Sequence, residues 1–211
     1  MEITIFMITD VNEAVRQLKP NVARKVNELF TIKRASHAAV ENLNSTIGLF
    51  TMIQDHFQPS FEMVEVGSFE GTSTMMFALF TKTVYSVDCY DYVVPSTGRI
   101  PSHDQLFIDA EKVFLERTVN IPNIVKIRKT SVEAARDFAD QSLDAVYIDA
   151  EHDEINIRTD IKTWGPKLKK GGVLSGHDFW LPHMGRIIRE EGYYQDIVVF
   201  QDTSWLVKLP S

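Results

Sequence analysis

The chain has 211 residues, of which 44% are hydrophobic and 24% are charged, and its formal net charge is −7. This length fits one domain, and the composition excludes collagen-like, low-complexity and wholly disordered chains. The negative charge disfavours binding to nucleic acid, and no apolar run reaches the roughly 18 residues that a membrane span requires. The single cysteine, Cys89, and an N-terminus without a signal-peptide pattern predict a cytoplasmic protein.

Apolar periodicity and turn residues predict an N-terminal helical extension over residues 1–58, with helices at Val11–Leu18 and Ser36–Phe57. The strands that follow are predicted at Phe61–Val66, Thr83–Val87, Ile124–Ile127, Leu143–Ile148, Val173–Ser175, Asp196–Phe200 and Trp205–Lys208. The helices between them are predicted at Thr72–Phe80, about Asp104–Arg117, Val132–Phe138, Glu154–Trp164 and His183–Glu191.

Strands that alternate with helices at this spacing predict parallel pairing through right-handed crossovers. The segment Gln201–Ser204 is too short for such a crossover, so the last two strands should form an antiparallel hairpin. We therefore predict an α/β fold, with a doubly wound, mostly parallel, seven-stranded sheet and an antiparallel hairpin at its C-terminal edge. Residues 59–211 should form this domain.

A glycine loop, with Gly67 and Gly71, follows the first strand of this domain, and Asp88 ends the next strand. Open sheets bind ligands at the carboxyl ends of their strands, where glycine lets a ligand approach the backbone and a carboxylate can accept hydrogen bonds from ribose hydroxyls. These features predict a cofactor that contains a nucleoside.

The loop has two glycines and two acids, Glu65 and Glu70, rather than the three glycines of a dinucleotide-binding loop. The acids would repel a diphosphate and would suit a cofactor with an amino group and a sulfonium, which is S-adenosylmethionine. A tight turn with solvated acids is the alternative.

Three stretches resemble known methyltransferases. Val64–Ser73 (VEVGSFEGTS) resembles the first motif of class I S-adenosylmethionine-dependent methyltransferases, specifically small O-methyltransferases of the catechol and macrolide-sugar type. Leu143–His152 (LDAVYIDAEH) and Gly171–Asp178 (GGVLSGHD) resemble a bacterial and phage methyltransferase group. The resemblance spans about residues 60–180 and implies a Rossmann-like methyltransferase fold. Cofactor contacts are then expected from Glu65, Gly67, Ser68, Gly71, Ser73, Asp88, Cys89, Ser131 and Asp149.

Methyl transfer needs alignment of donor and acceptor and a base for the acceptor's proton. His152 follows Asp149 just past the fourth strand of the domain, where catechol-type enzymes have a catalytic lysine. We therefore expect His152 and Asp149 to be catalytic. Capping or packing of the next helix is the alternative for His152.

The resemblance also implies a divalent cation, Mg²⁺ or Mn²⁺, at Asp149, His177 and Asp178. His177 stands where the catechol type has an aspartate, so a site without metal stays open. Asp178 would then orient His152 or contact the methionine end of the cofactor.

Other side chains have ordinary structural explanations. Ser131 could be the N-cap of the helix at Val132–Phe138 instead of an adenine contact. Asp160 and Trp164 are expected to be structural, and Trp180 is expected to pack rather than to wall the acceptor site.

Together, the sequence predicts a cytoplasmic S-adenosylmethionine-dependent O-methyltransferase that acts on a small hydroxylated molecule, such as a sugar or natural product. A nicotinamide-dependent oxidoreductase and a non-catalytic nucleoside-binding module are the alternatives. We expect no nucleic-acid or membrane partner, and the sequence leaves open whether the chain forms homo-oligomers.

Overall fold

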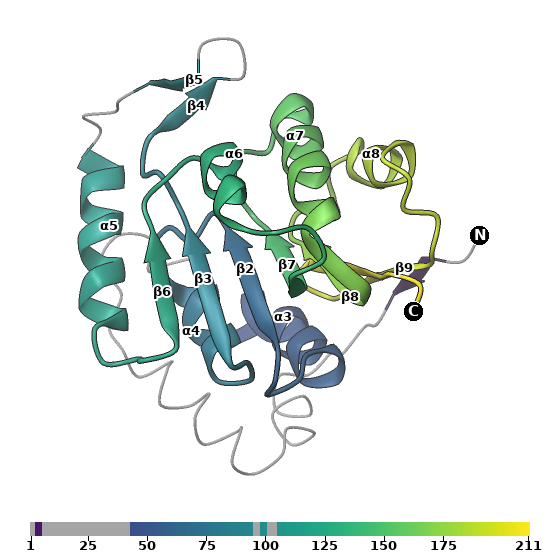
Figure 1. The fold of residues 1–211 in the computed structure, drawn as a ribbon, viewed down its shortest axis with the longest axis horizontal. Helices are drawn as coiled ribbons and strands as arrows, with labels where there is room; N and C mark the ends of the chain where they lie inside the picture. Colours follow the sequence, from purple (N-terminus) through teal and green to yellow (C-terminus); the bar gives the residue numbers. More distant parts are fainter. Residues whose placement is uncertain (1–2, 6–42, 95–97, 101–104) are drawn as a thin grey trace.

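The computed structural model describes residues 3–5, 43–94, 98–100 and 105–211 (Figure 1). Within these residues, eight strands form one sheet in the order β1-β9-β10-β8-β7-β2-β3-β6. Their bounds are β1 Ile3–Ile5, β2 Glu62–Val66, β3 Thr83–Val87, β6 Ile124–Ile127, β7 Leu143–Ile148, β8 Leu168–Gly176, β9 Ile197–Val199 and β10 Trp205–Lys208. A separate antiparallel pair consists of β4 Tyr92–Val94 and β5 Gly98–Ile100.

The described helices are α3 Leu43–His56, α4 Thr72–Ala78, α5 Gln105–Thr118, α6 Ser131–Ala134, α7 Glu154–Trp164 and α8 Met184–Glu190. Short 3₁₀ turns, η1 Ala135–Asp137 and η2 Gly165–Lys167, follow α6 and α7. The helix predicted at Val11–Leu18 and the first residues of the one predicted at Ser36–Phe57 lie outside the described residues. In the described part of the chain, no helix has the length and apolar character needed to cross a membrane.

The predicted doubly wound sheet is confirmed. Strand β2 pairs in parallel with β3 on one side and with β7 on the other, so the chain reverses its direction of winding at β2. The carboxyl ends of β6, β3 and β2 point to the same edge, the upper one in Figure 1. The topological switch point therefore lies between the ends of β2 and β7, where open sheets bind ligands.

The predicted C-terminal hairpin is also confirmed, because β10 runs antiparallel to β9. In detail, β10 is inserted between β8 and β9 rather than lying outermost. Strand β1, which no pattern in the sequence predicted, pairs in parallel with β9 and extends that side of the sheet. Strand β8 begins earlier than predicted because Gly171 and Gly172 lie inside it, next to a shift of register against β7.

Neighbouring residues of the central strands point to opposite faces of the sheet, and both faces are buried. Met63 of β2 and Tyr147 of β7 join the hydrophobic cluster under α3 and α4. Val64 and Val146 join the cluster under α7 and α8. Near-continuous apolar strands of this kind are typical of parallel sheets covered on both faces.

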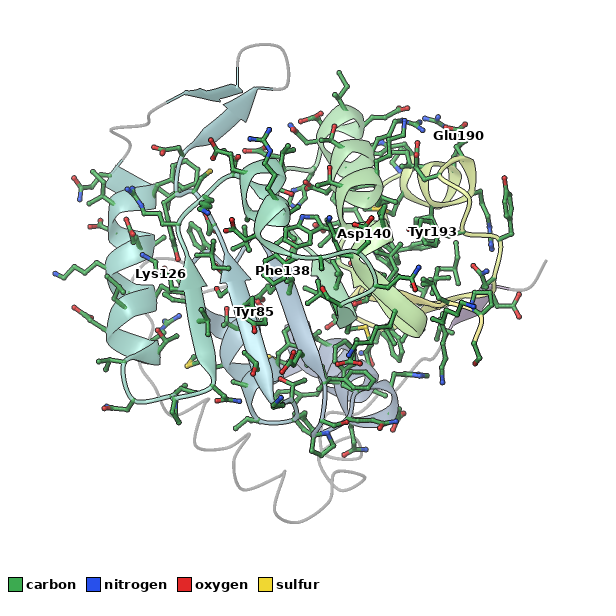
Figure 2. The ribbon with its side chains drawn as sticks, in the orientation of Figure 1. Tyr85, Lys126, Phe138, Asp140, Glu190 and Tyr193 are labelled. Atoms are coloured by element: carbon green, nitrogen blue, oxygen red, sulfur yellow. The ribbon has the colours of Figure 1, made fainter. Side chains whose placement is uncertain are left out.

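Helix α5 packs at the β6 edge of the sheet, and its contacts reach the glycine loop. Lys126 of β6 points toward α5 (Figure 2), where it pairs with Glu111 and lies 5.1 Å from the centre of the Tyr90 ring. The Tyr90 hydroxyl donates a hydrogen bond to the carbonyl of Phe69 (3.2 Å). This edge therefore supports one wall of the site described below.

Helix α3 lies within the predicted N-terminal extension, and its packing yields a first prediction. Ile53 is fully buried, so Ile53→Ala should lower the free energy of unfolding by about 2–5 kcal/mol. Far-UV circular dichroism and the fluorescence of Trp164 and Trp205 should both report this loss of stability. The two tryptophans lie on the face of the sheet opposite α3. The exposed Asp55→Ala should be near neutral. An unmoved fluorescence transition for Ile53→Ala would show that α3 is not part of the same cooperative unit.

Candidate functional site

The site is built where β2 and β7 end side by side. Gly67 follows β2 with a φ of 86°, and a Cβ added to it would lie 2.1 Å from the carbonyl oxygen of Asp149. The amide of Asp149 donates to the carbonyl of Val66 (2.8 Å), and the amide of Gly67 donates to that of Val87 (2.8 Å). Only glycine allows the strand ends to meet this closely.

Asp88, at the end of β3, holds the glycine loop in place. Its Oδ2 accepts hydrogen bonds from the amides of Ser68 (3.0 Å) and Phe69 (2.8 Å). Its Oδ1 accepts one from the amide of Tyr90 (2.7 Å). Burial nevertheless raises the pKa of Asp88 above its usual value. Because a carboxylate has about four acceptor positions, Asp88 keeps capacity for a ligand beyond these three amides.

A cavity of about 680 Å³ opens beside this loop. The predicted site residues that line it are Gly67, Ser68, Ser73, Asp88, Cys89, Ser131, Asp149 and His152. They come from the ends of four neighbouring strands, β2, β3, β6 and β7, as the fold prediction required. The thiol of Cys89 is buried and donates a hydrogen bond to the carbonyl of Asp91 (3.3 Å). Residues that no sequence pattern singled out complete the wall, among them Phe69, Phe107, Lys129, Thr130, Asn156 and Thr159.

Two predicted cofactor residues, Gly71 and Glu65, are not among the lining residues. A Cβ on Gly71 would lie 2.8 Å from the Phe114 ring, so this glycine serves the packing of α5. Glu65 is fully buried below the loop and accepts a hydrogen bond from the hydroxyl of Thr74. Its Oε1 meets no donor at bonding geometry in the described part of the chain. Burial raises the pKa of Glu65 to about 8.

The two acids of the loop differ in their surroundings, which corrects the argument from charge. Glu70 lines the cavity, but its Oε2 lies 3.1 Å from Nη1 of the buried Arg117. Arg117 compensates the charge of Glu70, and Glu65 lies outside the lining, so neither acid presents an uncompensated charge to the cavity.

Ser131 is not an N-cap, contrary to one of the two predictions for it. Thr130 caps α6 and forms a capping box with Glu133. Ser131 instead donates to Asp160 and accepts a hydrogen bond from Trp164 Nε1 (2.8 Å).

Asp160, which we expected to be structural, is a lining residue of the cavity. It is only 5% exposed, and burial raises its pKa to about 7 although the bond from Ser131 lowers it. Asn156 lies one turn before Asp160 on α7, Thr159 directly precedes it, and both line the same wall. This i, i+3, i+4 spacing was the signal available in the sequence.

His152 stands at the mouth of the cavity between two carboxylates. Its Nε2 lies 2.8 Å from Oδ2 of Asp178 and 3.7 Å from Oδ1 of Asp149, and its side chain is 55% exposed. The carboxylates of Asp149 and Asp178 raise the pKa of His152 to about 10. These side chains therefore keep His152 protonated at neutral pH.

His177 contacts the other oxygen of the same carboxylate, with Nδ1 3.2 Å from Oδ1 of Asp178. Burial lowers the pKa of His177, but the hydrogen bond to Asp178 and the charge of Asp149 outweigh this and raise it to about 9. Burial would raise the pKa of Asp178, yet the hydrogen bonds from both histidines hold it well below the usual range.

The predicted metal ligands were Asp149, His177 and Asp178, but the donor atoms that converge within 4.8 Å belong to Asp149, His152 and Asp178. The imidazole of His177 is not part of this group, and Nε2 of His152 is already hydrogen-bonded to Asp178 at 2.8 Å. The residues present therefore fit a resident divalent cation poorly.

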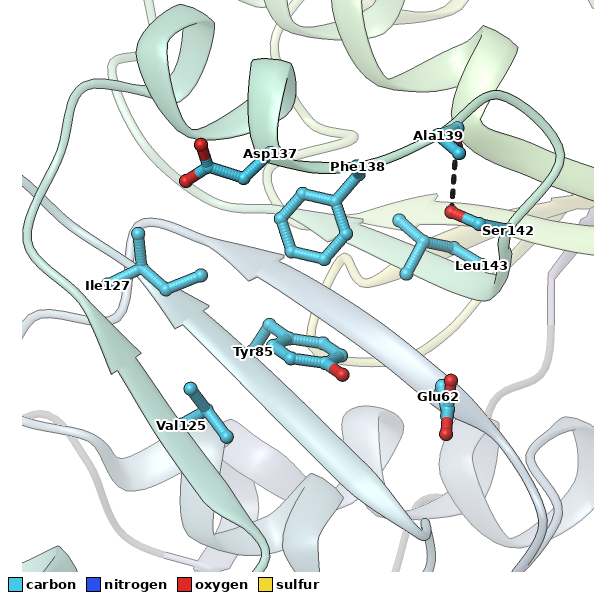
Figure 3. A pocket seen from close by; sticks show the side chains of 9 residues that line it. All are labelled: Glu62, Tyr85, Val125, Ile127, Asp137, Phe138, Ala139, Ser142 and Leu143. Atoms are coloured by element: carbon cyan, nitrogen blue, oxygen red, sulfur yellow. Dashed lines mark hydrogen bonds between the residues drawn. The ribbon is translucent and has the colours of Figure 1, made fainter.

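A second cavity, of about 370 Å³, lies on the other side of α6 (Figure 3). It is bounded mainly by apolar side chains, with Tyr85 facing Phe138, and its wall includes none of the predicted site residues. The larger cavity at the switch point is thus the candidate active site.

A cavity at the switch point of a doubly wound sheet, with a glycine loop and an acid on the next strand, defines a protein that binds a nucleoside cofactor. Residues 64–179 match the family described as "Methyltransferase domain". Because this match covers more than half of the chain, the chain belongs to that family, which confirms the resemblance to class I S-adenosylmethionine-dependent methyltransferases. This family membership argues against the alternative of a nicotinamide-dependent oxidoreductase.

Solved structures with the same fold are distant in sequence. A precorrin-6y C5,15-methyltransferase of Geobacter metallireducens is 12% identical, with a TM-score of 0.57 over 80% of each chain. SMU.1697c of Streptococcus mutans, solved with S-adenosylhomocysteine, is 15% identical, with a TM-score of 0.52 over 76% of this chain and 96% of that one. An S-adenosylmethionine-dependent O-methyltransferase of Thermotoga maritima is 13% identical, with a TM-score of 0.53 over 82% of this chain and 56% of that one. At these identities the likeness shows the fold alone, and a search of curated protein sequences found no match.

The close approach at Gly67 predicts the outcome of a matched pair of substitutions. Gly67→Ala should lower the free energy of unfolding by well over the roughly 1–2 kcal/mol that a positive φ costs, because its Cβ also meets backbone atoms. Gly192→Ala shares a positive φ (96°) but has open space around it, so it should show the dihedral cost alone. Urea denaturation measures both. Equal losses would contradict the proposed contact between the ends of β2 and β7.

Proposed function

We propose that this methyltransferase transfers a methyl group from S-adenosylmethionine to a hydroxyl of a small molecule, such as a sugar or natural product, with His152 as the general base. The observation that supports this most is the place of His152. It stands at the mouth of the cavity, half exposed, with Nε2 held 2.8 Å from Asp178. A hydroxyl entering from solvent could therefore reach this imidazole.

The donor fits the larger cavity on several grounds. Asp88 faces the glycine loop and retains acceptor capacity for ribose hydroxyls. Ser131 and the buried Asp160 offer acceptors for the amino group of adenine. Glu65 is fully buried and does not line the cavity, so it would act on the ammonium of the methionine part through its charge rather than by direct contact. A cation nearby would also favour the ionised form of Glu65.

The donor supplies an electrophilic methyl carbon. The acceptor oxygen would form the new C–O bond as the C–S bond breaks, with the electron pair staying on sulfur, and the hydroxyl proton would pass to Nδ1 of His152, because Nε2 already donates to Asp178. Asp178 orients the imidazole and stabilises its protonated form, and Asp149 adds negative charge on the cavity side. Alignment and proton removal are thus the tasks of the protein.

His152 can accept a proton only in its neutral form, although its pKa is about 10 in the empty site. A sulfonium bound beside Asp149 would oppose the imidazolium and lower this pKa, because like charges disfavour each other. Donor binding would then prepare the base.

This proposal makes the pH profile of turnover diagnostic. For the wild type, kcat/KM should rise with pH by about tenfold per unit through the neutral range, because the fraction of neutral His152 grows as pH approaches its raised pKa. The rise in kcat should be centred at lower pH than the rise in kcat/KM. His152→Ala should lose roughly 10²–10⁴-fold in kcat and the pH dependence with it.

Steady-state assays with labelled S-adenosylmethionine and hydroxylated acceptors measure these profiles. A His152→Ala enzyme with full turnover would remove His152 from the mechanism. Binding of the donor with no transfer to any acceptor would favour the non-catalytic module.

The poor fit to a resident cation yields a separate prediction. Dialysis against a chelator should leave kcat within about twofold, since two carboxylates and a protonated imidazole already satisfy one another. The measurement is turnover before and after dialysis, with Mn²⁺ and Mg²⁺ added back. Loss of activity that either ion restores would contradict this and return Asp149, His177 and Asp178 to consideration as ligands.

A further inference from the structure

We infer that the outer side of α5 is an interface between two copies of this chain, with α5 of one copy packed antiparallel against α5 of the other across a two-fold axis. The sequence alone left homo-oligomers open, and the structure offers a surface through which they can form. This association goes beyond the proposed function, because it does not depend on which acceptor is methylated.

The outer side of α5 presents an apolar stripe to solvent. Ile108 is 49% exposed, Leu115 50% and Val119 74%. The amide of Val119 donates to the carbonyl of Leu115 (3.1 Å), so Val119 continues the helical turn. Steps of seven and four residues place these three side chains on one face of the helix. In Figure 1, α5 is the outermost element on the β6 side of the sheet.

The other exposed large apolar side chains among the described residues lie singly on different elements. They are Val125 on β6, Val132 on α6, Ile155 on α7, Trp180 before α8 and Tyr194 after it. Trp180 was expected to pack, but it is exposed and donates a hydrogen bond to Asp178 (2.8 Å). Single exposed apolar residues are normal on a protein surface, whereas a row along one helix face is typical of a contact between helices.

The inner side of α5 is fixed to the glycine loop. The Phe114 ring is buried and lies so near Gly71 that a Cβ there would be 2.8 Å from it. Nη1 of Arg117 lies 3.1 Å from Oε2 of Glu70. The stripe is therefore presented in one orientation, which reduces the entropy lost when a partner binds.

The charges beside the stripe favour a second copy as the partner. Lys112 and Glu116 are exposed on one flank of the stripe, one helical turn apart. Among the described residues, neither of them forms an ion pair, although Glu111 and Arg117 of the same helix do. One copy thus offers a free cation and a free anion on the same flank, which is the pattern that a self-complementary contact requires.

These charges also choose between the two directions of packing. In an antiparallel pair, each flank faces its own counterpart across the two-fold axis. With the axis between positions 113 and 114, Ile108 lies opposite Val119 of the second copy. The stem of Lys112 then covers Leu115 of the second copy, and its ammonium reaches Glu116 there. A parallel pair would instead place Lys112 beside Lys112.

The size of the contact sets its strength. The stripe spans about three turns of one helix, so the two copies bury less than the roughly 1,200 Å² at which stable interfaces begin. We therefore expect a reversible dimer with a Kd in the micromolar range, which sedimentation velocity on the full chain can measure from a concentration series.

A matched pair of substitutions tests the surface. Leu115→Glu should weaken association by about 30-fold or more, because it places two like charges near the axis. Ile155→Glu makes the same kind of change at an exposed position of α7 and should leave the Kd unchanged. A wild-type chain that stays monomeric throughout the series would overturn the inference. So would a dimer that Leu115→Glu leaves intact.

Exchange of the two charges tests the antiparallel arrangement and keeps the test open if Leu115→Glu does not fold. Lys112→Glu and Glu116→Lys should each weaken self-association about tenfold at low ionic strength, because both bring like charges together. An equimolar mixture of the two variants should associate at least as tightly as the wild type, since each Glu then faces a Lys. Single variants that associate normally, or a mixture that does not recover, would contradict this pairing.

Discussion

The site depends on how closely the backbone ends of β2 and β7 approach each other. Gly67 accepts a positive φ that leaves no room for a side chain, and the amide of Asp149 bonds to the carbonyl of Val66 (2.8 Å). This contact places the glycine loop, which belongs to the cofactor side, against Asp149, which leads directly to His152. Asp88 then fixes the loop through the amides of Ser68 and Phe69. In the proposed function, the donor and acceptor sides would therefore share one edge of the sheet, which suits methyl transfer between aligned reactants.

The acceptor side is organised around Asp178. This carboxylate takes hydrogen bonds from His152, His177 and Trp180, and its pKa falls well below the usual range as a result. In the proposed function the base is set by this arrangement, because two carboxylates give His152 a pKa of about 10. Such a base works only when a nearby positive charge lowers that pKa, and the sulfonium of the donor is the charge available at this place. Proton removal and donor binding are coupled in this account.

Much of the fold followed from the sequence, because turn residues frame the apolar runs. Leu143–Ile148 and Trp205–Lys208 have the predicted bounds; polar residues flank the first strand on both sides, and Ser204 precedes the second. The early start of β8 could not be predicted, since Gly171 and Gly172 resemble a turn and a shift of register accommodates them. Within the site, the ends of the strands indicated which side chains lie close together. They did not indicate which of these side chains form hydrogen bonds or ion pairs with one another. The backbone turn at Asp178 determines that His152, rather than His177, joins Asp149 and Asp178. A contact between distant segments brings Arg117 to Glu70 and neutralises its charge.

A crystal structure of the protein with S-adenosylhomocysteine tests the central claim most directly, because it shows where the nucleoside lies. We predict adenosine in the larger cavity, with its ribose at Asp88, its base at Ser131 and Asp160, and its sulfur directed toward His152. Adenosine bound in the smaller cavity beside Tyr85 and Phe138, or bound with its sulfur directed away from His152, would contradict the account.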